Sequence, residues 1–313
     1  MGDRRGFLSG LAAYGLWGFF PLYIRLLRPS GAVEILSHRI VWSVVSVALL
    51  TTVLRRWDAI RALGRERRKL AGAALAAALI AVNWGTYIYG VNSDHVVETS
   101  LGYFINPLIS VLFGVFIFGE RLRSAQWVAI GIGAVAVGVI TWDYGRPPWI
   151  ALTLATTFGT YGLVKKRLGL PPTDGLLVES GALALPALAY VAWLTARGES
   201  TFTSISAGHA ALLVFAGVLT AVPLMFFADA ANRVSMTTLG MLQYTAPILQ
   251  LSIGVYVLDE PMPPARLAGF ALVWVALAVF TWDALRRARR ARAVVAREPV
   301  PAAVAPAAMA AGD

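Results

Sequence analysis

Three ionisable residues stand at the start of an apolar run, in the stretch VEILSHRIVW that covers residues 33–42. Glu34 and His38 are four residues apart and therefore share one face of the expected helix. This pair alone does not make a metal site, because the other histidines, His95 and His209, are distant in the sequence and the chain has no cysteine. Two roles stay open for His38, a proton carrier near neutral pH or a hydrogen-bonded structural histidine.

Arg39 is the residue of this stretch that a lipid bilayer tolerates least. It falls some seven residues into the expected helix, roughly 10 Å from its outer end at about 1.5 Å per residue. An arginine at mid-membrane costs about 2.5–3.5 kcal/mol even on a lenient insertion scale, and such residues generally mark solute pathways. We therefore favour a role for Arg39 in a translocation cavity over a structural arginine that reaches the surface or pairs with a neighbouring helix. Glu34 lies nearer the helix start and is expected to stay solvated at the outer mouth.

The composition indicates that these residues belong to a membrane protein. Of 313 residues, 58% are hydrophobic and 14% are charged, and the mean hydropathy is +0.68. About 20 apolar residues cross a bilayer as a helix. We therefore expect an all-α polytopic membrane protein with ten transmembrane helices. The expected spans are 7–27, 32–54, 70–91, 97–118, 125–143, 148–165, 175–195, 209–231, 237–258 and 264–284.

Basic residues are distributed as a membrane topology requires. With a cytoplasmic N-terminus, the inner segments hold most of them, including seven in residues 55–69. The outer segments hold four arginines, Arg28, Arg146, Arg197 and Arg266. This asymmetry predicts that both termini are cytoplasmic, and it accounts for the net charge of +10 without a nucleic-acid partner. Residues 286–313 are basic and then rich in Ala and Pro, which predicts a disordered cytoplasmic tail.

The two halves of the chain repeat each other at an offset of 140 residues. Residues 107–143 and 247–283 are identical at 11 of 37 positions, including a proline, a glutamate and the triplet Thr-Trp-Asp. Each copy holds five expected spans, and because five is odd the second copy must be inverted in the membrane. We therefore predict two inverted repeats, residues 1–145 and 146–285. Inverted repeats are typical of secondary transporters, whose substrate site lies between the halves near the bilayer midplane.

Several motifs carry a family resemblance. They include SLGYFINPL, GER, YGLVKK, MTTLG, QYTAP and FTWDAL, together with EILSHRIVWS, and they run through residues 7–285. The chain resembles the EamA-type transporters of the drug/metabolite transporter superfamily, and more closely their RarD branch, the chloramphenicol-sensitive proteins. This resemblance implies a ten-helix, two-repeat bundle in the bacterial inner membrane that exports or exchanges small organic solutes. It does not imply a particular substrate.

The repeat offset assigns a counterpart to the buried arginine. Arg39 corresponds to Glu179, and inversion puts the two at mirrored depths in opposite halves of the membrane. A buried glutamate needs a partner or a raised pKa. Our hypothesis is that Arg39 and Glu179 are the main charged groups of a central cavity and couple directly or through substrate. The alternative is a purely structural ion pair.

Aromatic and amide residues in the spans fit a cavity for an amphipathic organic molecule, although simple packing is the competing interpretation for each of them. The candidate substrate-binding residues are Tyr14, Trp17, His38, Arg39, Asn83, Trp84, Tyr87, Tyr103, Asn106, Glu179, Gln243 and Tyr244. The candidates for proton coupling are His38, Glu179 and Asp229, and the candidates for gating are Pro107 and Pro247, which can bend their helices. Glu120 and Glu260 are expected to be structural carboxylates at helix starts.

The leading functional prediction is a secondary transporter that works by alternating access on a small-molecule substrate, with a coupled proton or counter-solute as a further partner. The sequence has no motif for ATP hydrolysis, zinc-dependent proteolysis or a serine hydrolase, and no cofactor or metal is expected. The alternative is an intramembrane enzyme that acts on a lipid or small molecule through Glu34, His38 and Asp229. These three residues are scattered along the sequence, and for this reason we rank the enzyme second, ahead of a structural or assembly protein.

Overall fold

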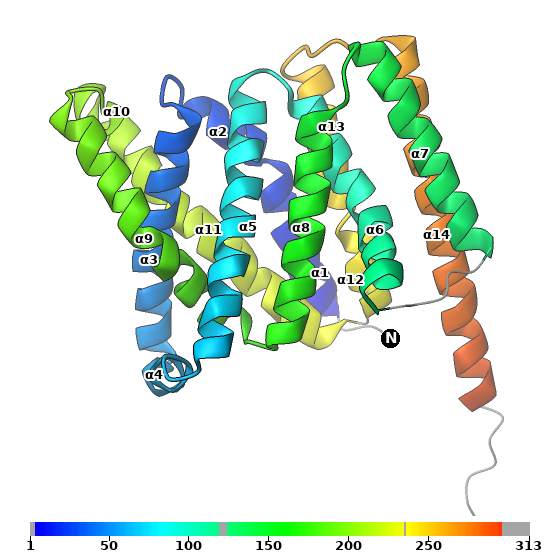
Figure 1. The fold of residues 1–313 in the computed structure, drawn as a ribbon, viewed down its shortest axis with the longest axis horizontal. Coiled ribbons are helices and arrows are strands. Elements are labelled where there is room, and N and C mark those ends of the chain that lie inside the picture. The colour runs from blue at the N-terminus through cyan, green and yellow to red at the C-terminus, as the bar shows by residue number, and fades with distance from the viewer. Residues whose placement is uncertain (1–3, 119–123, 235, 296–313) are drawn as a thin grey trace, which may run out of the picture.

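The computed structural model describes residues 4–118, 124–234 and 236–295, and it is all-helical within these ranges. Figure 1 shows most of the helices running side by side across one slab. The helices are α1 (Arg4–Gly18), α2 (Phe20–Leu26), α3 (Ala32–Val53), α4 (Trp57–Leu63), α5 (Arg67–Asn92), α6 (Val96–Phe118), α7 (Ser124–Tyr144), α8 (Trp149–Leu168), α9 (Pro172–Ala196), α10 (Thr201–Ser204), α11 (Ala207–Arg233), α12 (Met236–Leu242), α13 (Thr245–Tyr256) and α14 (Pro264–Val295).

Seven segments of the described chain are long and apolar enough to cross a membrane. The chain is therefore a multi-pass membrane protein, as its composition predicts. The seven segments are Arg4–Leu26, Ala32–Val53, Arg67–Asn92, Ser124–Tyr144, Thr173–Ala196, Ala207–Phe227 and Pro264–Asp283. The other three expected spans correspond to α6, α8 and the pair α12–α13, which run alongside these segments (Figure 1).

Two of the expected spans are broken helices. The first span is divided at Phe19 into α1 and α2, and Pro21, which lacks a backbone N–H, lies at the start of α2. The ninth is divided at Gln243 and Tyr244 into α12 and α13, and Pro247 follows in the first turn of α13. Pro107, the other proposed gating residue, lies inside the continuous α6. Pro107 therefore lies within an unbroken helix, whereas Pro247 lies next to a helix break.

The helices pack in pairs that join the two halves of the chain. α3 packs against α9, α6 against α13, and α7 against α14, which form the outermost pair in Figure 1. α1 and α3 both pack against α11, while α8 and α9 both pack against α5. α8 also packs against α6, and α1 against α13. Neither half therefore forms a separate bundle.

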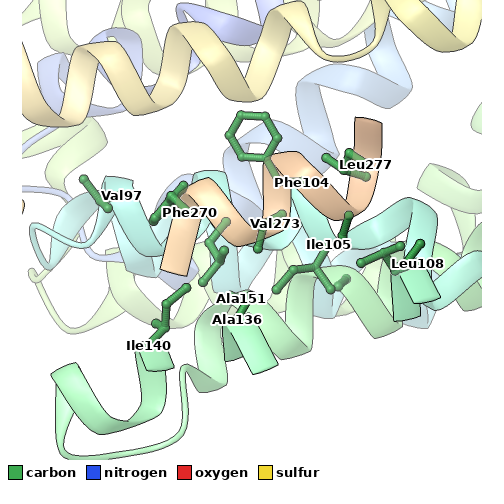
Figure 2. Packing of buried hydrophobic residues seen from close by; sticks show 14 residues of the cluster. Val97, Phe104, Ile105, Leu108, Ala136, Ile140, Ala151, Phe270, Val273 and Leu277 are labelled. Atoms are coloured by element: carbon green, nitrogen blue, oxygen red, sulfur yellow. The ribbon is translucent and has the colours of Figure 1, made fainter. Parts of the chain in front are cut away.

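The largest apolar cluster fixes α6, α7, α8 and α14 to one another. Figure 2 shows Phe104 and Ile105 of α6 gathered with Phe270 and Val273 of α14. Small residues such as Ala151 of α8 let the helix backbones approach closely, as is usual where membrane helices pack. This cluster forms a packed block to one side of the polar residues that the sequence singled out.

The two ends of the bundle differ in charge. The start of α1 and α4 lie at one end, called the α4 end, and α2 and α10 lie at the other, the α10 end (Figure 1). The four arginines that the sequence assigns to outer segments each form an ion pair with a carboxylate. These pairs are Arg28–Asp94, Arg146–Glu98, Arg197–Glu199 and Arg266–Asp143. Their positive charge is therefore locally neutralised.

Candidate functional site

Arg39 is buried where α2, α3, α5 and α11 meet, with 5% of its surface exposed. Its guanidinium carbon lies 4.0 Å from the centre of the Trp84 ring and 5.1 Å from that of Phe20. Its Nε donates a hydrogen bond to Thr220 Oγ1 at 3.1 Å. Stacking on aromatic faces stabilises a desolvated guanidinium by about 2 kcal/mol or more. The expectation that Arg39 lies inside the bundle, rather than reaching its surface, is met.

A glycine on α11 creates the room for this arrangement. Gly217 is buried and faces the backbone carbonyl of Trp42 on α3, so closely that a Cβ atom would collide with it. The close approach of the two helices brings Thr220, less than one turn further along α11, within reach of Arg39. Neither Gly217 nor Thr220 is signalled by the sequence, because both look like ordinary small residues of an apolar span.

Two tyrosines extend the aromatic surroundings of the guanidinium. Tyr87 and Tyr103 have ring centres 5.9 Å apart, and they pack in or against the apolar cluster that includes Phe20. The Tyr87 hydroxyl is buried and has no hydrogen-bond partner among the described residues. Asn83, one turn before Tyr87 on α5, donates to Leu154 O and to Thr157 Oγ1 across to α8. The structure thus places four of the predicted residues, Trp84, Tyr87, Tyr103 and Asn83, on or next to the surroundings of Arg39.

Most of the other predicted cavity residues lie elsewhere. Tyr14 and Trp17 of α1 pack on Phe227 of α11 in a second aromatic cluster, and Trp17 also packs against the apolar cluster that includes Phe20 and Tyr87. Tyr244 packs against the large cluster of Figure 2, at the break between α12 and α13 where Gln243 also lies. Asn106 faces Gly159 of α8, and its Oδ1 is buried without a partner among the described residues. The predicted set is therefore not one continuous lining.

Glu179 is buried, as expected, but its partner is different from the predicted one. Lys165 Nζ lies 2.6 Å from its Oε1, and the Tyr161 hydroxyl donates to its Oε2 at 2.9 Å. Of the two expected couplings between Arg39 and Glu179, the direct ion pair is therefore not formed, and coupling through substrate stays a prediction. Lys165 lies near the end of α8, and its long side chain reaches back to the carboxylate and neutralises it.

Glu34 is not solvated at a mouth of the bundle. It is buried, and its Oε1 accepts hydrogen bonds from the backbone N–H of Thr201 at 2.8 Å and from Ser200 Oγ at 3.2 Å. His38, one turn further along α3, stacks on Phe202 with ring centres 4.8 Å apart. The expectation of an exposed Glu34 is wrong because the short helix α10 folds over the start of α3. We name the contact of Glu34 with Ser200 and Thr201 the α10-end clasp.

A second clasp joins the same two helices at the opposite end. Asp174, in the first turn of α9, accepts two hydrogen bonds from Arg56, from Nε at 2.9 Å and from Nη2 at 2.6 Å. This bidentate pair, the α4-end clasp, was not predicted, and the repeat offset relates only its acid, Asp174, to Glu34. In each clasp, an acid at the start of one helix binds the segment that follows the other helix.

Between the α4-end clasp and Arg39 there is a pocket of about 230 Å³. Its walls come from α3, α9 and α11, and they are mostly apolar. The lining residues are Val47, Leu50, Leu54, Thr173, Leu176, Ala221, Leu224 and Met225. This partly open pocket therefore lies on the α4 side of the buried arginine.

Asp229 lies near the α4 end rather than within a span. It follows the candidate span Ala207–Phe227, and its side chain is 27% exposed. Hydrogen bonds from Ser9 and from Arg233 hold the pKa of the Asp229 carboxyl below its ordinary value. The description of Asp229 as an intramembrane acid is therefore wrong, and a carboxylate that stays ionised near neutral pH is poorly suited to carry a proton there.

The lowered pKa of Asp229 predicts how stability depends on pH. A depressed folded pKa means that the carboxylate stabilises the fold above its unfolded pKa, and that this contribution is lost as pH falls through the folded pKa. Asp229→Asn should therefore lower the melting temperature slightly at about pH 7, and this difference should shrink only as pH falls below about 4, the ordinary pKa of an Asp carboxyl, and through the lower folded pKa. Thermal unfolding across this range tests it, with Asp58→Asn, at an exposed i,i+3 pair, as the control. A constant difference at all pH values would contradict the prediction.

Glu260 fulfils its expected structural role on an unexpected helix. Its two carboxylate oxygens accept hydrogen bonds from the backbone N–H groups of Val96 at 2.6 Å and Val97 at 2.8 Å. It therefore caps the start of α6 in the first half of the chain, where negative charge is also favoured by the helix dipole.

Glu120 lies outside the described residues. Within those residues, no group of three or more His, Cys, Asp or Glu side chains could hold a metal ion.

Comparisons with known proteins bear on the whole chain. The model of the EamA-like transporter family matches twice, at residues 4–142 and 147–282. Protein RarD of Streptomyces exfoliatus is 58% identical over 93% of this chain and 92% of its own length. The Escherichia coli Protein RarD is 38% identical over 92% and 97%, and the chloramphenicol-sensitive protein RarD of Pseudomonas aeruginosa is 31% identical over 91% and 96%. A solved crystal structure shares the fold with a TM-score of 0.58 at 18% identity, over 88% of this chain and 96% of that one.

Proposed function

The chain belongs to the EamA-like transporter family, in its RarD branch, and from this premise we propose that it is a secondary transporter of a small organic solute that works by alternating access. In this proposal ten transmembrane helices form two inverted five-helix repeats, residues 1–145 and 146–285, that rock against each other. The two separate matches to the family model, one in each half, support this division.

The observation that carries the proposal is the symmetry of helix packing. The repeat offset relates α3 to α9, α5 to α11, α6 to α13 and α7 to α14, and it relates α1 and α2 to α8. Under this relation the contact of α1 with α11 becomes that of α8 with α5, and the contact of α3 with α11 becomes that of α9 with α5. The contact of α6 with α8 becomes that of α13 with α1. The pairs α3–α9, α6–α13 and α7–α14 map onto themselves, which is expected of elements on a two-fold axis.

The proposed pathway runs through Arg39 between the two clasps. Trp84, Tyr87 and Tyr103 would line it, and the pocket on the α4 side would be part of the route toward that end. Pro107 and Pro247 stay candidates for gating, and His38 and Glu179 for proton coupling. The alternative enzyme has little support, because Glu34 and His38 lie toward the α10 end, whereas Asp229 lies near the α4 end.

We place the protein in the bacterial inner membrane with both termini cytoplasmic. Two features of charge support this orientation. The α4 end carries the basic segment of residues 55–69, and the arginines of the proposed outer segments are each paired with a carboxylate. The larger number of lysines and arginines in the segments of the α4 end therefore favours that end as the cytoplasmic one.

Transport assays in proteoliposomes test the proposal. We expect the full-length protein to accelerate the passage of at least one member of a panel of amphenicols, amino acids, nucleosides and aromatic carboxylates. We also expect saturation and, for a coupled transporter, a response to an imposed pH gradient or to a counter-solute on the other side. Passive leakage of every solute at the rate of empty liposomes would contradict the proposal, and a chemically altered product would favour the enzyme.

A further inference from the structure

The buried positive charge of Arg39 has no negative partner in the protein. Among the lysines and arginines that the structure describes, Arg39 is the only one that is buried. No described carboxylate forms an ion pair with it, and its one hydrogen bond to a described residue goes from Nε to Thr220. Removing a charge from water is unfavourable unless the charge is paired. The aromatic faces of Trp84 and Phe20 offset part of this cost but leave the net charge in place.

No acid inside the bundle is available to supply the missing charge. All five buried carboxylates of the described chain are already bound to donors. Glu34 binds Ser200 and Thr201, Glu98 binds Arg146, Asp174 binds Arg56, Glu179 binds Lys165 and Tyr161, and Glu260 binds Val96 and Val97. The counter-ion of Arg39 must therefore come from outside the described fold, and a bound solute is the natural source.

The geometry of the guanidinium indicates which solute would fit. Aromatic rings lie against the guanidinium, and Thr220 takes the Nε–H, so that the terminal Nη groups stay without an acceptor among the described residues. These groups form a planar fork that matches a carboxylate or a similar oxyanion. The Tyr87 hydroxyl, which is also unpartnered, can donate a further hydrogen bond.

The surroundings of the fork are aromatic rather than polar. The Phe20 and Trp84 rings lie against the guanidinium, and Tyr87 and Tyr103 pack in or against the apolar cluster that includes Phe20. An inorganic anion would leave these surfaces without a contact, whereas an aromatic acid would cover them. We propose, on the basis of the proposed transport function, that the solute is an organic anion whose carboxylate binds to Arg39 and whose apolar body packs on these rings.

A set of isosteric probes tests this inference by binding rather than by transport. Indole-3-acetate, indole-3-acetamide and tryptamine have similar shapes but are an anion, a neutral molecule and a cation. The purified full-length protein is titrated with each, and binding is followed by the thermal shift and by isothermal titration calorimetry. The anion is expected to bind at least about tenfold more tightly than the amide or the amine, as charge-assisted bidentate hydrogen bonds require. Equal binding of all three probes, or no binding of the anion, would overturn the proposal.

Substitutions of Arg39 test whether this residue causes the tighter binding of the anion. Arg39→Gln is expected to bind the anion and the amide equally, and Arg39→Lys to keep part of the preference because it retains charge without the fork. Arg266→Gln is the matched control, because Arg266 also lies over an aromatic ring, that of Tyr144, but has its own carboxylate, Asp143. An unchanged preference in Arg39→Gln would overturn the proposal. If Arg39→Gln does not fold, the affinities of the three probes for the wild type and for Arg39→Lys still test the proposal. A preference for the anion that is the same in both proteins would then overturn it.

Failure of this inference can be told apart from failure of the proposed function. A protein that transports neutral solutes and does not distinguish the acid from its amide would overturn the anion proposal alone. A protein that binds the acid through Arg39 but moves no solute across proteoliposomes would overturn the transport proposal and leave the binding site standing.

Discussion

The Gly217→Ala variant is expected to lose about 3 kcal/mol of stability, at the upper end of the range for overpacking a well-packed core, together with most of its transport. The added methyl group would collide with the backbone carbonyl of Trp42 and lie 2.8 Å from its Cβ. A backbone atom cannot rotate away as a side chain can, so α11 and α3 must separate. Their separation would also move Thr220 away from the Nε of Arg39, which links the packing defect to the proposed solute site.

The measurement is the thermal unfolding of the purified variant, combined with the transport assay. Gly181→Ala is the matched control, because Gly181 also lies within a helix, α9, and has no atom within 4 Å of the position of an added Cβ. We expect Gly181→Ala to unfold at or slightly above the wild-type temperature, since alanine favours a helix more than glycine does. If both variants were equally stable, the close approach of α3 and α11 would not be needed for the fold.

Much of the helical architecture could be predicted from the sequence, because apolar length is imposed by the bilayer. The expected span 32–54 corresponds to α3 at Ala32–Val53, and 125–143 corresponds to α7 at Ser124–Tyr144. The sequence predicts that Pro247 can bend its helix, and the ninth span breaks just before it, at Gln243 and Tyr244. The break at Phe19 was not predicted, because the apolar pattern is the same on both sides of it. Only backbone hydrogen bonding distinguishes one long helix from two short ones.

The burial of Arg39 could be predicted from the sequence, but the partners of the charged residues could not. That Arg39 would be buried followed from its position in an apolar run, but its pairing with Glu179 did not hold. A repeat offset relates equivalent positions, and equivalent positions of an inverted repeat need not be in contact. The partner of Glu179 came instead from the flexible side chain of Lys165, and the burial of Glu34 came from a connection, residues 200–202, that has no periodic pattern.

The two clasps have the relation that alternating access requires. Glu34 and Asp174 are equivalent under the repeat offset, and each ties the start of its own helix to the segment after the other helix. The clasps therefore close opposite ends of the same antiparallel pair, α3 and α9. Arg39 lies between them. Suppose that opening one end requires the clasp at that end to break while the other clasp stays formed. Weakening one clasp should then favour the conformation that is open at the end where that clasp lies.

We therefore expect Glu34→Gln and Asp174→Asn, two substitutions that keep side-chain size and remove charge, to have opposite effects on access. Because the chain has no cysteine, a single introduced cysteine reports on its own position. Ser37→Cys and Leu177→Cys are buried positions, equivalent under the offset, near the α10 end and the α4 end respectively. Glu34→Gln should speed maleimide labelling of Ser37→Cys by about tenfold, and Asp174→Asn should do the same for Leu177→Cys, if each loses about 1.4 kcal/mol from one closed end.

The crossed combinations separate a gate from a static tie. In an alternating mechanism, Glu34→Gln leaves labelling of Leu177→Cys unchanged or slows it, because the two ends do not open together. A clasp that only stabilises the fold predicts instead that each variant speeds labelling at both reporters through general loosening. Glu199→Gln provides the control, since its pair with Arg197 lies close to the α10-end clasp but is half exposed and worth at most about 1 kcal/mol. Equal acceleration at both ends would therefore rule out the clasps as gates, whereas opposite changes would make α3 and α9 the moving pair around Arg39.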